Sequence, residues 1–256
     1  MKFDIVTIFP RMVEAFAAEG VVGRAAQRGL IDVRVRDLRL FTDDRHRTVD
    51  DVPYGGGPGM VMKPEPFVRA AEAIERERGR PGAVVLMSPQ GRRFTQAEAA
   101  RFRTAGHVIL LCGRYEGLDD RVREYLQADE LSIGDYVISG GELAALVVVD
   151  AVSRLVPGVV GDGESVERDS FSRGLLDFPQ YTRPADFRGL AVPAVLLSGH
   201  HEEIRRWRKR EALRRTLERR PDLLAPDELD DEEREMIREW RGDVEEGVGH
   251  GRDRDS

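Results

Sequence analysis

The chain has 256 residues, which is enough for one large domain or for a medium and a small domain. Its formal net charge is −7, which excludes a surface coated in positive charge but leaves room for local basic patches. With a single cysteine, no signal-peptide pattern and no apolar run long enough to cross a bilayer, we expect a reduced, soluble, cytoplasmic protein without disulfides.

Short apolar runs alternate with helical patterns along the first 155 residues. The runs predict strands and helices in chain order: strands at 2–9, 31–38, 83–88, 107–113 and 129–134, and helices at 64–78, 95–104, 119–126 and 141–155. Apolar strands that alternate with helices predict an α/β fold with a parallel sheet covered on both faces.

The second half of the chain has a different composition. Residues 157–184 are rich in glycine, proline and charge, which predicts a linker. A basic helix is predicted from Glu202 to near Pro221, and another helix at 229–240. These patterns divide the chain into an α/β domain, a flexible linker, a helical domain and a disordered tail, at 1–160, 161–175, 176–244 and 245–256.

Common phosphate, metal and hydrolase motifs are missing. None of the three lysines follows a glycine, as a Walker-type loop requires, and no G-x-G-x-x-G follows a strand. In HEEIR (His201–Arg205), arginine stands where a zinc-binding helix needs its second histidine. No serine has G-x-S-x-G surroundings. P-loop enzymes, zinc enzymes and α/β-hydrolases are therefore disfavoured, and no metal site is predicted.

Three glycine-bearing loops follow predicted strands. They are MSPQG (Met87–Gly91), CGRYEG (Cys112–Gly117) and SIGDYVISGG (Ser132–Gly141). Ligands of open α/β sheets bind beyond the carboxyl ends of the strands. Each loop alone is most simply a tight turn. Three such loops at one edge predict a pocket for a small molecule.

An ordered set of motifs resembles the bacterial tRNA (guanine-N1)-methyltransferase family. The motifs are DDVPYGGGPGMVM (Asp50–Met62), LCGRYEGLDDRV (Leu111–Val122), SIGDYVISGGEL (Ser132–Leu143) and SFSRGLLDFPQYTRP (Ser170–Pro184). The resemblance runs from Met1 to about Trp240. It implies an α/β, parallel-sheet SPOUT-type domain with a deep trefoil knot, a small C-terminal helical domain, and a homodimer whose active sites are shared between subunits.

The implied reaction transfers a methyl group from S-adenosylmethionine to N1 of the guanine immediately 3′ of the anticodon (guanine 37) in tRNA. Carried over residue by residue, the resemblance implies that the donor lies among Leu86, Ser88, Pro89, Gly113, Tyr115, Glu116, Ile133, Gly134, Asp135, Tyr136, Val137, Ile138, Gly140 and Gly141. Without the resemblance, a role in core packing suits Tyr136 almost as well as a ligand contact does. Tyr115 would then be a turn residue, and Glu116 a solvated carboxylate.

The resemblance also assigns two catalytic side chains. Because guanine N1 carries a proton, a base must remove it, and negative charge then builds on O6. The resemblance implies that Asp169 is the base and that Arg154 stabilises the charge on O6. From the sequence alone, Asp169 would be a helix cap or turn residue, and Arg154 a cation that complements a helix dipole.

RNA is expected to contact the C-terminal basic helix at Arg205, Arg208 and Arg215, with His46 and Arg47 as further candidates. The competing interpretation is a solvated helix face, because glutamates are interspersed in the same helix. Whether Mg²⁺ assists is left open. The alternatives are another SPOUT-type RNA methyltransferase and a non-catalytic RNA-binding module with a vestigial donor pocket.

Overall fold

The computed structural model describes residues 1–161, 170–171, 174–224 and 229–249, with the backbone alone for 241–249. The chain divides into two compact units, Met1–Val166 and Glu167–Ser256. The linker predicted at 161–175 falls largely on residues outside this description. No helix in the described part of the chain has the length and apolar content needed to cross a membrane.

The first unit is built on a five-stranded sheet in which every neighbouring pair of strands is parallel. The strand order is β2 (Asp32–Asp37), β1 (Lys2–Thr7), β6 (His107–Cys112), β5 (Ala83–Arg93) and β7 (Asp129–Ser132). Each strand overlaps one of the predicted apolar or alternating runs. The predicted α/β fold with a central parallel sheet is therefore confirmed.

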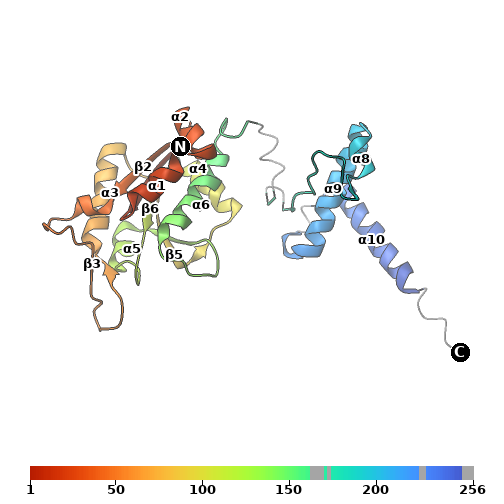
Figure 1. Cartoon of the computed structure of the whole chain (residues 1–256). Helices are drawn as coiled ribbons and strands as arrows, with labels where there is room; N and C mark the ends of the chain where they lie inside the picture. Colours follow the sequence, from red (N-terminus) through yellow and green to blue (C-terminus); the bar gives the residue numbers. More distant parts are fainter. Residues whose placement is uncertain (162–169, 172–173, 225–228, 250–256) are drawn as a thin grey trace. The chain divides into compact units, whose positions relative to one another are not determined.

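Helices cover both faces of this sheet (Figure 1). One face packs against α1 (Pro10–Ala17), α2 (Gly20–Gln27), α4 (Gln96–Ala105) and α6 (Gly141–Arg154). The other face packs against α3 (Pro64–Arg78), α5 (Arg121–Leu126) and the short 3-10 helix η1 (Leu38–Phe41).

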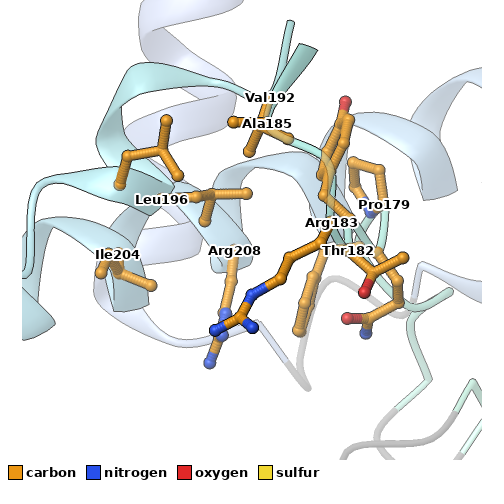
Figure 2. Close-up of a pocket in the computed structure, with 12 residues that line it drawn as sticks. Pro179, Thr182, Arg183, Ala185, Val192, Leu196, Ile204 and Arg208 are labelled. Carbon is orange, nitrogen blue, oxygen red and sulfur yellow. The ribbon is translucent and has the colours of Figure 1, made fainter. Parts of the chain in front are cut away.

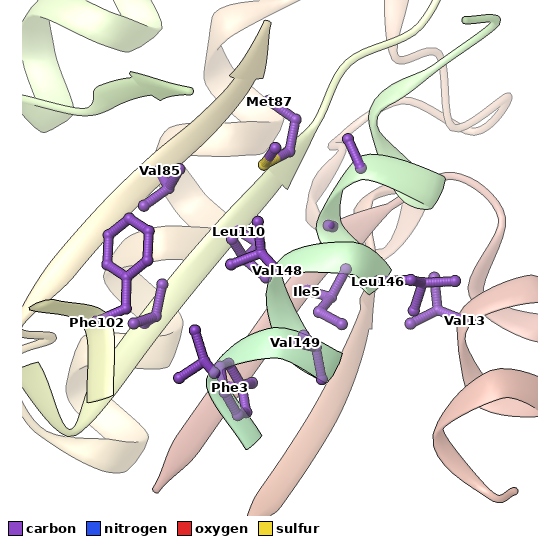
Figure 3. Close-up of a cluster of buried hydrophobic side chains, with 14 of the residues drawn as sticks. Phe3, Ile5, Val13, Val85, Met87, Phe102, Leu110, Leu146, Val148 and Val149 are labelled. Atoms are coloured by element: carbon purple, nitrogen blue, oxygen red, sulfur yellow. The ribbon is translucent and has the colours of Figure 1, made fainter. Parts of the chain in front are cut away.

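Strand β6 shows why the sequence forms a covered sheet. All six of its residues are buried, and their side chains alternate between the two layers. Leu110 belongs to the core beneath α6, whereas Ile109 belongs to the core beneath α3. Figure 3 shows Phe3 and Ile5 of β1 packed with Val148 and Val149 of α6 in the first of these cores. A strand buried on both faces must be a continuous apolar run, as observed.

Some elements of the first unit are not predicted from the sequence. Helices α1 and α2 are short, and neither has a side-chain cap at its N-terminus. The strands β3 (Asp50–Asp51) and β4 (Val61–Met62) form a small antiparallel hairpin around the glycine-rich loop. Such short elements have too few residues to show a period in the sequence.

Strand β5 continues beyond its predicted end at Ser88. The chain bends between Met87 and Arg92, and both residues pair with Leu131 of β7. Gly91 makes this close passage feasible, because a Cβ there would lie 2.3 Å from the backbone nitrogen of Leu131. The loop Ser88–Gly91 is thereby held against the carboxyl end of β7.

The second unit contains α9 (His201–Arg219) and α10 (Asp231–Gly249). Smaller elements accompany them: the hairpin of β8 (Asp186–Phe187) and β9 (Leu190–Ala191), the helix α8 (Ala194–Leu197) and the 3-10 helix η2 (Pro221–Leu223). A small core joins Leu175, Leu213 and Met236. Helix α10 extends into the stretch 245–256, which the sequence predicts to be a disordered tail, and 250–256 lie outside the described residues.

Candidate functional site

The carboxyl ends of β5, β6 and β7 open onto one cavity of about 560 Å³, which we call the strand-end cavity. Its walls come mainly from the loops at 86–90, 113–118 and 130–141. Small-molecule sites typically measure roughly 300–1,000 Å³. The three glycine-bearing loops, which are far apart in the sequence, therefore enclose one space of suitable size.

The structure brings together nearly all of the residues that were predicted to hold the donor. The strand-end cavity is lined by Leu86, Ser88, Pro89, Gly113, Tyr115, Glu116, Ile133, Gly134, Tyr136, Val137, Ile138, Gly140 and Gly141. Asp135 differs, because it is exposed and does not line the cavity. It sits in the same loop as its neighbours, but the sequence cannot show which residues of a loop face inward.

Glycine is required at two points of the cavity wall. Gly141 begins α6, and a Cβ there would lie 2.8 Å from the Cα of Cys112 in β6. Gly134 has a φ of +149°, and a Cβ there would lie 2.6 Å from the ring of Tyr136. A side chain at either position would therefore displace the cavity wall. Burial raises the pKa of the Cys112 thiol well above its usual value, so this cysteine stays protonated beneath the wall.

Arg114 ties the end of β6 to the loop before α6. Its Nε and Nη2 atoms each lie 2.9 Å from Oε2 of Glu142, and its Nη1 donates a hydrogen bond of 3.1 Å to the carbonyl of Ser139. Glu142 is fully buried, and its Oε1 accepts a 2.7 Å hydrogen bond from the Thr7 hydroxyl. A Cβ at Gly140 would overlap the Arg114 side chain. We call Thr7, Arg114 and Glu142 the buried clasp.

Sequence reasoning missed this clasp. Arg114 and Glu142 each stand beside glycines in the sequence motifs, but Glu116 and Asp135 do the same, so the sequence does not single out the buried pair. A buried carboxylate needs a paired cation or several hydrogen-bond donors, and here it has both. The clasp fixes Ser139 and Gly140 where they wall the cavity.

A second hollow of about 530 Å³ borders the strand-end cavity. It is lined by Ile8 and Phe9, and it shares Tyr115 and Val137 with the first cavity. The guanidinium of Arg114 stacks over the Phe9 ring at 4.4 Å from the centroid. Tyr115 is 57% exposed, with a φ of +60°, so its ring stands at the boundary between the two hollows. Two adjoining spaces of this kind can hold a donor and an acceptor side by side.

The glycine-rich hairpin borders the same site. The backbone N–H of Glu116 donates a 3.1 Å hydrogen bond to the carbonyl of Met60. The Glu116 side chain lies so close to Gly59 that a Cβ there would overlap it. At the tip of the hairpin, Tyr54 is 98% exposed.

Comparison with known proteins decides the family. A family model described as tRNA (guanine-1)-methyltransferase TrmD matches residues 1–226. The chain belongs to the tRNA (guanine-1)-methyltransferase family. The resemblance inferred from the ordered motifs is thus confirmed, and with it the class of enzyme, a methyltransferase.

Several relatives are similar along almost their whole length, and each is named tRNA (guanine-N(1)-)-methyltransferase. One from Pelotomaculum thermopropionicum is 55% identical over 96% of this chain and 98% of its own length. One from Geobacter metallireducens is 53% identical over 97% and 99%. One from Geobacillus kaustophilus is 51% identical over 96% and 100%.

The two catalytic residues that the tRNA (guanine-1)-methyltransferase resemblance implies are Arg154 and Asp169. Arg154 is the last residue of α6 and is half-buried, whereas Gly141 at the other end of the same helix lines the strand-end cavity. Arg154 follows Gly141 by thirteen positions, which in a helix is about 20 Å. Arg154 is therefore remote from the cavity of its own chain. Asp169 lies outside the described residues.

Of the predicted RNA-contact residues, Arg205 pairs with carboxylates of the protein itself. It forms ion pairs with Glu202 at 2.7 Å and Glu232 at 3.0 Å. Lys209 also pairs with Glu232, at 2.8 Å. The hydrogen bonds from Arg205 and Lys209 lower the pKa of Glu232 to about 2. These contacts join α9 to α10, so Arg205 has a role in the packing of the second unit.

The other predicted RNA-contact residues occupy varied settings. Arg208 is exposed, with its guanidinium 5.0 Å from the centroid of the Phe178 ring, and Arg215 is half-buried on α9. His46 and Arg47 are exposed in a loop of the first unit. Across the described ranges of the chain, no three His, Cys, Asp or Glu side chains are grouped so that they could hold a metal ion.

Proposed function

We propose that the protein transfers a methyl group from S-adenosylmethionine to N1 of guanine 37, the base immediately 3′ of the anticodon, in tRNA. The observation that carries the proposal is the strand-end cavity, whose walls are the three glycine-bearing loops. Membership of the tRNA (guanine-1)-methyltransferase family and the names of the relatives support the same reaction. A protein that modifies tRNA in this way acts in the cytoplasm.

The residues of the strand-end cavity suit S-adenosylmethionine. The sequence has no glycine–lysine phosphate loop, and this donor has no phosphate. Leu86, Ile133 and Ile138 offer apolar contacts for an adenine ring, and the backbone near Gly134 and Gly141 can approach it closely. S-adenosylmethionine, when bound, supplies an electrophilic methyl group on a positively charged sulfur.

The side chains of the protein then prepare the guanine. The base occupies the second hollow, against Tyr115, so that N1 faces the strand-end cavity. The carboxylate of Asp169 takes the proton from N1, which makes the nitrogen nucleophilic. The guanidinium of Arg154 donates hydrogen bonds to O6, where negative charge develops. The buried clasp holds the loop at Ser139 and Gly140 in position during these steps.

The distance between Arg154 and the cavity of its own chain supports a shared site in a homodimer. Helix α6 carries an exposed apolar stripe, with Leu143 50% and Val147 46% exposed, and Arg154 continues the same stripe at helical spacing. Met12 and Phe16 of the neighbouring α1 are also exposed. A second copy covers this surface and brings its Arg154 to the first copy's cavity.

The proposal includes the trefoil knot of the SPOUT fold and tRNA binding by the second unit. Another SPOUT-type RNA methyltransferase activity is the main alternative, and it predicts a different acceptor.

Incubation with labelled donor and unmodified tRNA transcripts tests the proposal. Methylation should map to N1 of guanine 37 and disappear when that guanine is replaced. Asp169→Ala should lower transfer by about 10²–10⁴-fold while donor binding is retained. Glu72→Ala is the control, because it removes an exposed carboxylate of α3 that does not line the cavity, and it should keep normal transfer. Transfer that persists without guanine 37 would refute the assignment.

A further inference from the structure

The second unit holds a pocket of its own, of about 310 Å³, that the proposed chemistry does not use (Figure 2). One wall is apolar and is formed by Val192, Leu196 and Ile204. The opposite wall is the segment Phe178–Arg183 of the fourth sequence motif, with Phe178 and Tyr181 as its aromatic members. We call this space the FPQYTR pocket. The fourth sequence motif therefore lines a pocket within the second unit.

Two arginines give the FPQYTR pocket a positive side. Arg183 and Arg208 both line it, and Figure 2 shows their side chains extending toward the same side. None of the described residues that line the pocket carries a carboxylate. Neither arginine makes a hydrogen bond or an ion pair with another described residue; Arg208 stacks on Phe178 instead. Two guanidinium groups that have no counter-charge among the described residues attract an anion, above all a phosphate.

Two cations beside Arg208 on α9 are in a different situation. Arg205 and Lys209 flank Arg208 along α9, and both pair with Glu232. Their charge is therefore used within the protein, whereas that of Arg183 and Arg208 is available to a ligand. The basic helix that the sequence singled out thus contains two kinds of arginine.

The aromatic wall is suited to a flat ring. Tyr181 is 48% exposed, and its ring is held by a tilted contact with Trp207, with 6.2 Å between the ring centroids. A side chain fixed in this way offers a ring face without a large entropy cost. Nucleobases stack on such rings whatever their sequence, and arginines contact the adjoining phosphate.

We propose that the FPQYTR pocket binds one unstacked nucleotide of the RNA substrate. The base lies between Tyr181 and the apolar wall, and its phosphate contacts Arg183 and Arg208. The inference rests on the proposed function in that the RNA is the tRNA to be methylated. An apolar peptide would use the wall formed by Leu196 and Ile204 but would leave both guanidinium groups unpaired.

The phosphate contact is tested with Arg183→Ala and Arg208→Ala in the full-length protein. Each should weaken binding of an unmodified tRNA transcript by about tenfold and lower the slope of log affinity against log salt by about 0.7–0.9. Arg219→Ala removes the same charge from the far end of α9 and should change binding less than twofold. Equal binding by wild type and the two pocket variants, or an equal loss in Arg219→Ala, would overturn the inference.

The base contact is tested with Tyr181→Ala and transcripts that carry one abasic nucleotide at successive positions. At one position the abasic change should weaken wild-type binding several-fold, with no further loss in Tyr181→Ala; Tyr181→Phe should behave as wild type. If no tRNA position shows this dependence on Tyr181, the inference is wrong. Donor binding and melting temperature, which should be unchanged, exclude misfolding. Methyl transfer by wild type is measured in parallel, so that failure of the proposed function is seen separately.

Discussion

At the scale of single residues, the buried clasp explains what holds the glycine-containing loop at Ser139 and Gly140 in place. Arg114, Glu142 and Thr7 come from three segments, yet each polar atom of the Glu142 carboxylate has a partner. Removing one member of a buried pair leaves the other charge uncompensated, which typically costs about 3–5 kcal/mol. A substitution that keeps the shape of the side chain, such as Glu142→Gln, is therefore more informative than a truncation.

Glu142→Gln should weaken donor binding by about tenfold, because the amide keeps the shape of the side chain but loses the charge that holds Arg114. Isothermal titration with S-adenosylmethionine measures the effect. Glu124→Gln makes the same chemical change at an exposed carboxylate of α5 and should leave affinity unchanged. Unaltered donor affinity in Glu142→Gln would show that the clasp does not shape the cavity.

Gly141→Ala places a methyl group 2.8 Å from the Cα of Cys112, where only backbone could yield. We expect a loss of about 1–3 kcal/mol in the free energy of unfolding and at least tenfold weaker donor binding, since the wall of the cavity must shift. Chemical denaturation and titration measure the two effects. Gly161→Ala is the control, because a Cβ there meets nothing within 4 Å. Equal behaviour of the two variants would contradict the packing argument.

At the scale of elements, the contact between α9 and α10 makes the second unit sensitive to acid. The folded-state pKa of Glu232 is about 2, below its ordinary value of 4.5. Its stabilising effect is therefore present above pH 4.5 and is lost as the pH falls toward 2. Because the pair is partly exposed, solvent screening keeps the effect modest.

The second unit should therefore melt at progressively lower temperature between pH 4.5 and 2. Both tryptophans, Trp207 and Trp240, lie in this unit, so their fluorescence reports its unfolding. In Glu232→Gln the Gln side chain does not titrate, and the melting temperature should vary less with pH over the same window. A wild-type melting curve that does not shift in this range, or one that shifts equally in the variant, would show that the ion pairs do not join the helices.

The elements also show how far sequence reasoning reaches. Strand β6 and helix α6 were predictable because burial imposes an apolar run on the one and a helical period on the other. The extension of β5 through Gly91 was not, since its polar residues pair only because β7 lies beside them. Likewise, the pairing of Arg205 with Glu232 could not be predicted, because the two residues are 27 positions apart in the sequence.

The candidate site likewise has features that the sequence predicts and features that it does not. The three loops could be assigned to one pocket because the carboxyl ends of parallel strands meet at one edge. The outward direction of Asp135 and the partners of Glu142 depend on tertiary contacts, which no local pattern records. The FPQYTR pocket was hidden for the same reason, since its walls are joined only when α9 packs beside the motif.

At the scale of the whole molecule, the central claim is that one active site is built from two copies of the chain. The strand-end cavity lies at the start of α6 and Arg154 at its end, about 20 Å away. The exposed stripe of Leu143 and Val147 on the same helix supports a second copy packed along it. Each active site then combines the strand-end cavity of one copy with Arg154 of the other copy.

Mixing two inactive variants tests this claim most directly. Arg154→Ala keeps the strand-end cavity, and Gly141→Ala keeps Arg154 but binds the donor weakly; each alone should transfer little methyl to guanine 37. Co-expressed at limiting donor concentration, they form a mixed dimer in which one cavity is intact and faces an intact Arg154, so transfer should recover to a substantial fraction of the wild-type rate. If the mixture stays as inactive as its components while mixed dimers are present, Arg154 does not act across the interface and the account of a shared site is wrong.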